Sequence, residues 1–162
     1  MTIKGVIIGL FMVVVVMIGN ALASDTYDYA SSCPQSPDRV DKWSFYTCEC
    51  TSYSADKMNE HGVGLWNYYK GVHWGYARNW KNAAMAARIS CTTTPKHRDI
   101  AWWAPSSANH YYGHVAYVES VDSSGNITVS EYNWAKPFDY GTRAIKRGSS
   151  SYPQSFIHFG AK

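Results

Sequence analysis

A cysteine at the start of a predicted helix is the strongest candidate for a chemically reactive group in this sequence. Cys50 follows an aromatic run and begins a helix-compatible stretch that ends near Gly62, and glycine is common directly after helix ends. The macrodipole and the free N–H groups at a helix N-terminus stabilise a thiolate, and the same N–H groups can bind an oxyanion. Cys50 is therefore predicted to be a nucleophile that works with a base from elsewhere in the chain.

Two predicted strands supply this base and a polar partner for it. His114 lies in the run Gly-His-Val-Ala-Tyr-Val-Glu at 113–119, while Glu131 and Asn133 lie in the run Ser-Glu-Tyr-Asn-Trp at 130–134. A neighbouring imidazolium lowers the pKa of a thiol well below its ordinary value of about 8.5, which favours a thiolate–imidazolium pair at neutral pH. Glu131 or Asn133 would hold the second imidazole nitrogen, and the residue types alone do not separate these two.

The turn between the two strands predicts which side chains share a face. If residues 122–125 form the loop, antiparallel pairing puts Asn133 opposite His114. By the same count Glu131 lies opposite Ala116, which is on the same face of its strand as His114. A loop one residue longer or shorter would move both polar side chains to the other face, so the prediction depends on this loop length.

Three motifs in the order Cys, His, Glu/Asn resemble those of the CHAP family, the cysteine- and histidine-dependent amidohydrolases/peptidases. They are Glu-Cys-Thr-Ser-Tyr at 49–53 and the two runs at 113–119 and 130–134. The resemblance spans roughly residues 46–159 and implies a papain-like α+β fold, in which helices that carry the cysteine pack on an antiparallel sheet. It also implies Glu131 as the main third catalytic residue and Asn133 as a supporting site residue.

For a chain with a secretion signal, the resemblance implies a hydrolase of peptidoglycan. The bond cleaved would be the one between N-acetylmuramic acid and L-alanine, or a peptide bond in the stem or cross-bridge. Glu49 stands where the family usually has glutamine, and Ser52 where it often has an aromatic residue, which bears on substrate preference more than on fold. The alternative is a non-catalytic module that binds envelope glycans or peptides, although such a module would not need all three catalytic residues.

The first 23 residues differ in composition from the rest. Lys4 precedes an apolar run at 6–18 and an Ala-Leu-Ala cleavage signal at 21–23, a pattern typical of a secretory signal peptide. An uncleaved anchor is the alternative, but the run is shorter than the roughly 20 residues of a membrane span. We therefore predict a secreted or periplasmic protein with an N-terminal arm at 24–45 and one catalytic domain at 46–162.

Composition and charge limit the possible partners. The 162 residues are 46% hydrophobic and 17% charged, as in a single globular domain. The formal charge of +3 falls to +2 without Lys4, since 14 basic and 12 acidic residues remain, and this is too small to predict nucleic-acid binding. We expect a monomer with peptidoglycan as its partner and no cofactor. Asp38 and Asp41 are too sparse for the calcium site of some relatives, so no metal is predicted.

Four cysteines in a secreted chain predict a disulfide. If Cys50 is catalytic, Cys33, Cys48 and Cys91 can form one bridge, and the sequence does not choose among the three pairings. Two alternatives are that all four cysteines are bridged, or that Cys48 and Cys50 bind a metal. The metal site is disfavoured because the spacing is not the usual C-x2-C and no second pair follows.

Hydrophobic periodicity predicts helices first and strands afterwards, which indicates an α+β fold. A second helix is expected from Asn79, as N-cap, to Ile89, and strands at 99–103, 114–121, 126–134, 141–146 and 155–159. The seven Trp and thirteen Tyr suggest a groove for glycans or peptides, since aromatic faces stack on both. The residues predicted to line it are Trp134, Tyr112 and Trp74.

Overall fold

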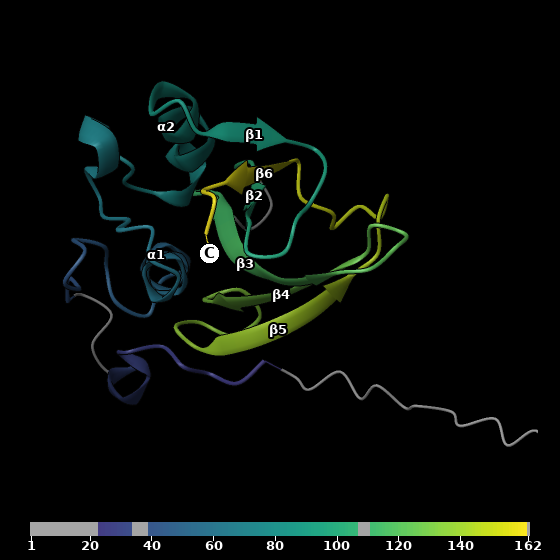
Figure 1. Cartoon of the computed structure of the whole chain (residues 1–162). Helices are drawn as coiled ribbons and strands as arrows, with labels where there is room; N and C mark the ends of the chain where they lie inside the picture. Colours follow the sequence, from purple (N-terminus) through teal and green to yellow (C-terminus); the bar gives the residue numbers. More distant parts are fainter. Residues whose placement is uncertain (1–22, 34–38, 107–110, 162) are drawn as a thin grey trace, which may run out of the picture.

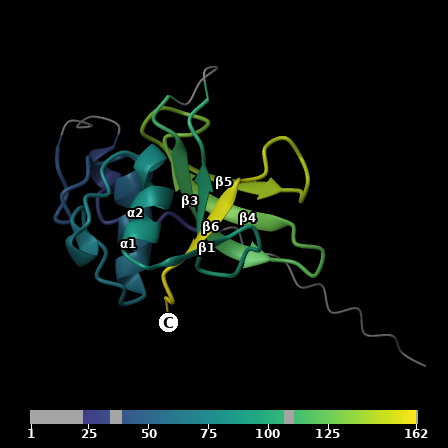
Figure 2. The ribbon, with the colours of Figure 1, turned by 90° about the horizontal axis from the view of Figure 1, so that it is seen from above.

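Six antiparallel strands form a curved sheet, and two α-helices lie on one side of it (Figures 1 and 2). The computed structural model describes residues 23–33, 39–106 and 111–161. The predicted signal peptide, apart from Ala23, therefore lies outside the described residues. In the described part of the chain, no helix is long and apolar enough to cross a membrane.

The strand order in the sheet is β1-β6-β2-β3-β4-β5. The α+β fold is confirmed, with six strands in place of about five, and the five predicted strands lie within two residues of their predicted bounds. β1 was not predicted because it is a short edge strand with two exposed residues and no apolar alternation. The strands are β1 (Ser90–Thr92), β2 (Ile100–Trp103), β3 (His114–Val121), β4 (Ile127–Tyr132), β5 (Tyr140–Ile145) and β6 (Ser155–His158).

The helices are α1 (Cys50–Glu60) and α2 (Trp80–Ala86), and α1 begins at the predicted residue. α2 is shorter than predicted and follows a 3-10 turn, η3 (Ala77–Asn79). Asn79 occupies the N-cap position of α2, as predicted, but its backbone is already helical and its side chain makes no capping hydrogen bond. Two further 3-10 turns are η1 (Ala30–Ser32) and η2 (Tyr69–Gly71).

Buried side chains cover both faces of the sheet because neighbouring strand residues point to opposite sides. The cluster between the helices and the sheet includes Tyr53 and Trp80 from the helices and Tyr117 from β3. The cluster on the other face includes Ala116 and Val118. His114 has the same parity as these last two residues, so its side chain continues their row at the start of β3.

The β3–β4 hairpin has the predicted register near the site and a different register near its turn. Val118 pairs with Val129, as predicted. Toward the turn, Val121 pairs with Ile127 rather than with Asn126, so the loop is one residue longer than expected. A bulge that follows Val118 absorbs the extra residue, because it places two residues of β3 opposite one residue of β4. The predicted faces near the site are therefore preserved.

Asp122 accounts for the longer loop. Its carboxylate accepts hydrogen bonds from the backbone N–H groups of Ser124 and Asn126 and from the Asn126 amide. These bonds hold Asn126 in the turn instead of in β4. Residue counting did not include these side-chain bonds, because it took residues 122–125 as the whole loop.

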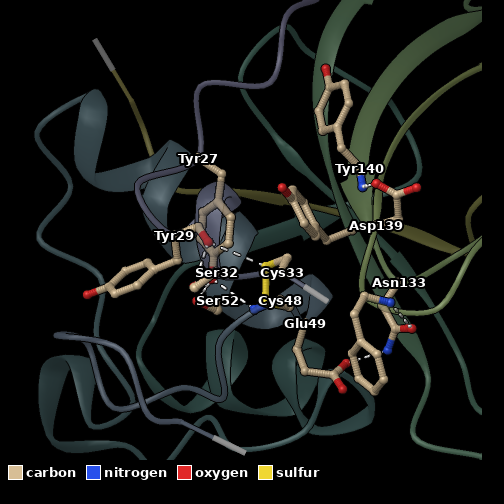
Figure 3. The surroundings of a disulfide bond; sticks show 12 residues. Tyr27, Tyr29, Ser32, Cys33, Cys48, Glu49, Ser52, Asn133, Asp139 and Tyr140 are labelled. Carbon is tan, nitrogen blue, oxygen red and sulfur yellow. Dashed lines mark hydrogen bonds between the residues drawn. A yellow bond between two sulfur atoms is a disulfide. The ribbon is translucent and has the colours of Figure 1, made fainter. Parts of the chain in front are cut away.

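A disulfide joins the N-terminal arm to the residue two positions before the proposed nucleophile. Cys33 and Cys48 are bridged, with 5.7 Å between their Cα atoms (Figure 3). This is one of the three predicted pairings. Cys50 and Cys91 are free, so the alternative in which all four cysteines are bridged is wrong.

The arm also packs on the rest of the domain through tyrosine hydroxyls. Tyr27 accepts a hydrogen bond from the Cys48 backbone N–H at 3.0 Å, and its hydroxyl lies 2.6 Å from that of Ser52 in α1 (Figure 3). The Tyr132 hydroxyl donates to Asp25 Oδ2 at 2.7 Å and so ties the arm to β4. In Figure 1 the arm runs below β5 and reaches α1. The bridge and these bonds fix the chain just before the first turn of α1.

Replacing Cys33 with serine is expected to lower the free energy of unfolding by about 2–4 kcal/mol, because the bridge restricts the unfolded chain. Urea denaturation would measure this difference. The double variant Cys33→Ser/Cys48→Ser is the matched control, since it removes the bridge without leaving a free thiol two residues from Cys50. An unchanged midpoint in both variants would contradict a stabilising bridge.

Candidate active site

Cys50 lies in the first turn of α1, beside the start of β3. The residue is only 8% exposed, and the backbone N–H groups of Val115 and Thr51 lie near enough to the thiol to lower its pKa. Val115 directly follows His114, so the thiol lies close to the start of β3. Glu49 is the N-cap residue of α1, and its side chain makes no capping hydrogen bond. The backbone N–H groups in the first turn of α1 can therefore bind an oxyanion.

His114 and Glu131 form a buried hydrogen-bonded pair. His114 Nε2 lies 2.8 Å from Glu131 Oε2, and both side chains are 2% exposed. β3 and β4 bring them together on the face that the hairpin register predicts. The predicted contact between the candidate base and a carboxylate partner is therefore present.

Arg143 of β5 completes the surroundings of Glu131 and was not predicted from the sequence. Its Nε donates to Glu131 Oε1 and its Nη2 to Oε2 at 2.9 Å, a bidentate arrangement. Burial raises the pKa of Glu131, but the hydrogen bonds from His114 and Arg143 outweigh burial and hold that pKa below its ordinary value. Glu131 is therefore a carboxylate at neutral pH.

Two tryptophans surround this group of charged and polar side chains. The Arg143 guanidinium lies 4.0 Å from the ring centroid of Trp134 and 5.0 Å from that of Trp103. The His114 ring centroid lies 4.7 Å and 5.5 Å from the same two rings. Apolar faces around an ion pair exclude water and lower the local dielectric, which strengthens the attraction between the charges.

The Asn133 side chain is hydrogen-bonded to Glu49, whereas strand pairing predicts that it lies opposite His114. β4 ends at Tyr132, and Asn133 has a positive φ of 57°, so the chain turns away from the strand there. The Asn133 amide donates to Glu49 Oε2 at 2.6 Å (Figure 3). The Asn133 side-chain oxygen accepts a hydrogen bond from the Phe138 N–H. Asn133 thus fixes the side chain that precedes Cys50. Burial raises the pKa of Glu49, and the Asn133 bond acts against this rise.

A pocket of about 870 Å³ opens beside Cys50 and His114, a size typical of ligand sites. Tyr112 and Trp134 line it, as predicted, together with Glu49 and Asn133. Trp74 does not: its side chain is fully buried in the core, in edge-to-face contact with Trp80, so the prediction that it lines the groove is wrong. Trp74 lies in a Gly-rich loop, and a loop has no sequence periodicity from which the burial of its side chains could be predicted.

The pocket disfavours an isolated thiolate. Burial raises the pKa of the Cys50 thiol, and the Glu49 and Glu131 carboxylates act in the same direction. The N–H groups of Val115 and Thr51 oppose this rise. A thiolate here therefore requires a cation formed at the same time, which a proton acceptor such as His114 would provide.

The family model of the CHAP domain matches residues 40–133 of this sequence, a range that contains Cys50, His114 and Glu131. The chain belongs to the CHAP family. The predicted resemblance is therefore confirmed, and the observed fold of two helices on an antiparallel sheet is the one it implied.

Among CHAP-domain relatives, staphylococcal secretory antigen SsaA of Staphylococcus aureus strain NCTC 8325 is 34% identical over 110 residues. That match covers 68% of this chain and 38% of the relative. Secretory antigen ssaA2 of the same strain is 36% identical over 110 residues, with 68% and 37% covered. The chain thus spans less than two fifths of the length of these relatives.

A similar solved structure is that of N-acetylmuramoyl-L-alanine amidase from Staphylococcus aureus. It superimposes with a TM-score of 0.58 at 30% sequence identity. The superposition covers 67% of this chain and 30% of the amidase chain. Both the sequence and the structure comparisons thus relate this CHAP chain to one part of longer proteins.

Within the described part of the CHAP chain, no group of three or more His, Cys, Asp or Glu side chains is placed to hold a metal ion. Asp38 lies outside the described residues. Asp41 accepts hydrogen bonds from the backbone N–H groups of Trp43 and Phe45 and from the Ser52 hydroxyl. Its carboxylate therefore has a structural role in the turn before α1.

Proposed function

We propose that this chain is a secreted cysteine hydrolase of peptidoglycan that cleaves an amide bond with Cys50, His114 and Glu131. The observation that carries the proposal is the buried hydrogen bond between Glu131 and His114, which lines the same pocket as Cys50. A similar structure is named an N-acetylmuramoyl-L-alanine amidase, which supports amide cleavage in peptidoglycan. Relatives named secretory antigens support secretion, as does the composition of residues 1–23.

The first half of the reaction forms an acyl-enzyme. The Cys50 thiol gives its proton to His114, and the thiolate attacks the carbonyl carbon of the scissile amide. The oxygen becomes an oxyanion, which the first-turn N–H groups of α1 receive. The C–N bond then breaks as His114 returns the proton to the leaving amine, and the acyl group remains on sulfur as a thioester.

The second half restores the enzyme. His114 takes a proton from a water molecule, whose oxygen attacks the thioester carbonyl. The carboxylic acid leaves, and the proton on His114 returns to the Cys50 sulfur. Glu131 stabilises the imidazolium in both halves and holds the ring by Nε2, so that proton exchange with Cys50 takes place at Nδ1.

Arg143 and Asn133 act as positioning residues in this scheme. Arg143 holds both oxygens of Glu131, so the carboxylate cannot rotate away from His114. Asn133 holds Glu49 through a hydrogen bond and so fixes the residue next to the nucleophile. Neither residue is required to exchange a proton.

Digestion of purified peptidoglycan with the protein lacking residues 1–23 tests the proposal. We expect soluble products that mass spectrometry can identify. Free stem peptides beginning with L-alanine would indicate an amidase, and shortened or uncross-linked stems would indicate an endopeptidase. Tight binding to the wall without any product would contradict the hydrolase and leave the non-catalytic binding module.

A further inference from the structure

The pocket beside Cys50 is lined by a basic side chain, Arg78, that takes no part in the proposed reaction. Arg78 of η3 lines the pocket, as do Tyr76, Tyr111 and Tyr112. The guanidinium carbon lies 5.4, 5.0 and 5.6 Å from the centroids of these three rings. The three tyrosines are 47%, 68% and 53% exposed, so the cluster forms an open wall of the pocket.

The Arg78 guanidinium has aromatic neighbours but no carboxylate partner among residues 23–33, 39–106 and 111–161. Glu49, the carboxylate that lines the same pocket, is hydrogen-bonded to Asn133. Arginine that stacks on rings through its face keeps its N–H groups at the edge of the plane, and these fit a carboxylate in bidentate fashion. Arg78 therefore has the chemistry of an anion-binding side chain.

The backbone of Arg78 is fixed relative to His114. The Arg78 N–H donates to the Tyr112 carbonyl at 2.6 Å. Gly113, which separates Tyr112 from His114, has a φ of +71°, and a Cβ there would lie 2.9 Å from Arg78 N, Arg78 Cα and the Trp103 carbonyl oxygen. The close contact at Gly113 links η3 to the start of β3, so Arg78 and His114 keep a constant relative position.

We propose that Arg78 binds a carboxylate of the substrate peptide and makes the enzyme select stems in which this group is free over stems in which it is amidated. This inference rests on the proposed function, since it names the substrate feature that the same pocket recognises. A neutral amide cannot form the charge-assisted pair with the guanidinium, and its NH2 group would face the N–H donors. The tyrosine wall keeps the guanidinium in place before the substrate arrives, which lowers the ordering cost of binding.

Two groups on a stem peptide with lysine at its third position supply this chemistry: the free carboxyl of its D-isoglutamate residue and its C-terminal carboxyl. Binding would be measured by calorimetry with the Cys50→Ser protein, so that hydrolysis is not required. Three N-acetylmuramoyl pentapeptides serve as probes: one acidic only at isoglutamate, one acidic only at the C-terminus, and one amidated at both. We expect one of the two acidic probes to bind about 10- to 100-fold more tightly than the fully amidated one.

The variant Arg78→Met in the Cys50→Ser background is expected to bind all three probes equally, at the affinity of the fully amidated probe. Lys81→Met is the matched control, because Lys81 also stacks on an aromatic ring, 5.4 Å from Trp102, and does not line the pocket. It should preserve the preference. Equal affinities for all probes with Arg78 present, or a preference that survives Arg78→Met, would overturn the proposal.

Hydrolysis by the protein with Cys50 intact separates this proposal from the proposed function. Turnover of the acidic and amidated probes at equal kcat/KM would reject carboxylate selection while leaving the hydrolase in place. Binding that depends on Arg78, without turnover of any probe and without release of fragments from intact peptidoglycan, would reject the hydrolase and keep the carboxylate site. Arg78→Lys, which retains the charge without the bidentate geometry, should show an intermediate preference.

Discussion

Replacement of Cys50 by serine is expected to lower kcat for peptidoglycan hydrolysis by roughly 10⁴-fold or more, as removal of a catalytic nucleophile does in other hydrolases. A serine hydroxyl is far less acidic than a thiol, so it does not form the alkoxide–imidazolium counterpart of the thiolate–imidazolium pair on which the proposed reaction depends. The side chain is nearly the same size, and Cys50 is already buried among backbone donors. We therefore expect an unchanged fold and unchanged wall binding.

Cys91→Ser is the matched control, since Cys91 is the other free cysteine and lies in the edge strand β1. Its activity should stay within about twofold of the unmodified protein, as expected for a partly exposed position away from the pocket. Release of soluble wall fragments measures activity, and a thermal melt checks the fold. An active Cys50→Ser protein, or an inactive but folded Cys91→Ser protein, would show that the wrong thiol has been assigned.

The parts of the site that lie within local motifs could be predicted from the sequence. The helix that begins at Cys50 was predicted from the helix-compatible stretch between the aromatic run and Gly62, and the shared face of His114 and Glu131 was predicted from hairpin pairing. The hairpin prediction had the wrong loop length and was correct near the site only because a bulge compensates. Agreement there was therefore partly fortuitous.

The parts that depend on tertiary packing could not be predicted. Arg143 reaches Glu131 through the pairing of β4 with β5, and residues 133–139 between them are too long a loop to set a register by counting. Gly141 and Ile145 lie on the same face of β5 as Arg143. Neither residue type predicts a charged side chain on that face. The burial of Trp74 likewise depends on its contacts with Trp80 of α2 and with Phe159, which follows β6 and comes from a distant part of the chain.

Glu131→Gln is expected to reduce kcat/KM by roughly 10²- to 10⁴-fold, and by more than Asn133→Ala does. The carboxylate accepts hydrogen bonds from His114 and Arg143 at the same time. In glutamine, the NH2 group would face an N–H donor of one of these two residues, and two donors cannot form a hydrogen bond. Loss of the negative charge also removes the stabilisation of the imidazolium. Asn133→Ala removes the hydrogen bond that holds Glu49, which leaves the His114–Glu131 pair in place.

The effect of Glu131→Gln on the free energy of unfolding is expected to depend on pH. The pKa of Glu131 is held below its ordinary value of 4.5, so its ionised form stabilises the fold above that pH, and the contribution is lost as pH falls through the lowered pKa. The free energy of unfolding of Glu131→Gln should therefore be lower than that of the unmodified protein at neutral pH. This difference should shrink in acid, which urea denaturation at several pH values would measure.

Glu119→Gln is the matched control for Glu131→Gln. Glu119 lies in the same hairpin and accepts a hydrogen bond from the Ser130 hydroxyl at 2.6 Å, so the control makes the same chemical change away from His114. Its activity should stay within about twofold of the unmodified protein. If Asn133→Ala instead proves more damaging than Glu131→Gln while both variants remain folded, Asn133 is the third member of the site, in a Cys-His-Asn arrangement, and the role assigned here to Glu131 is wrong.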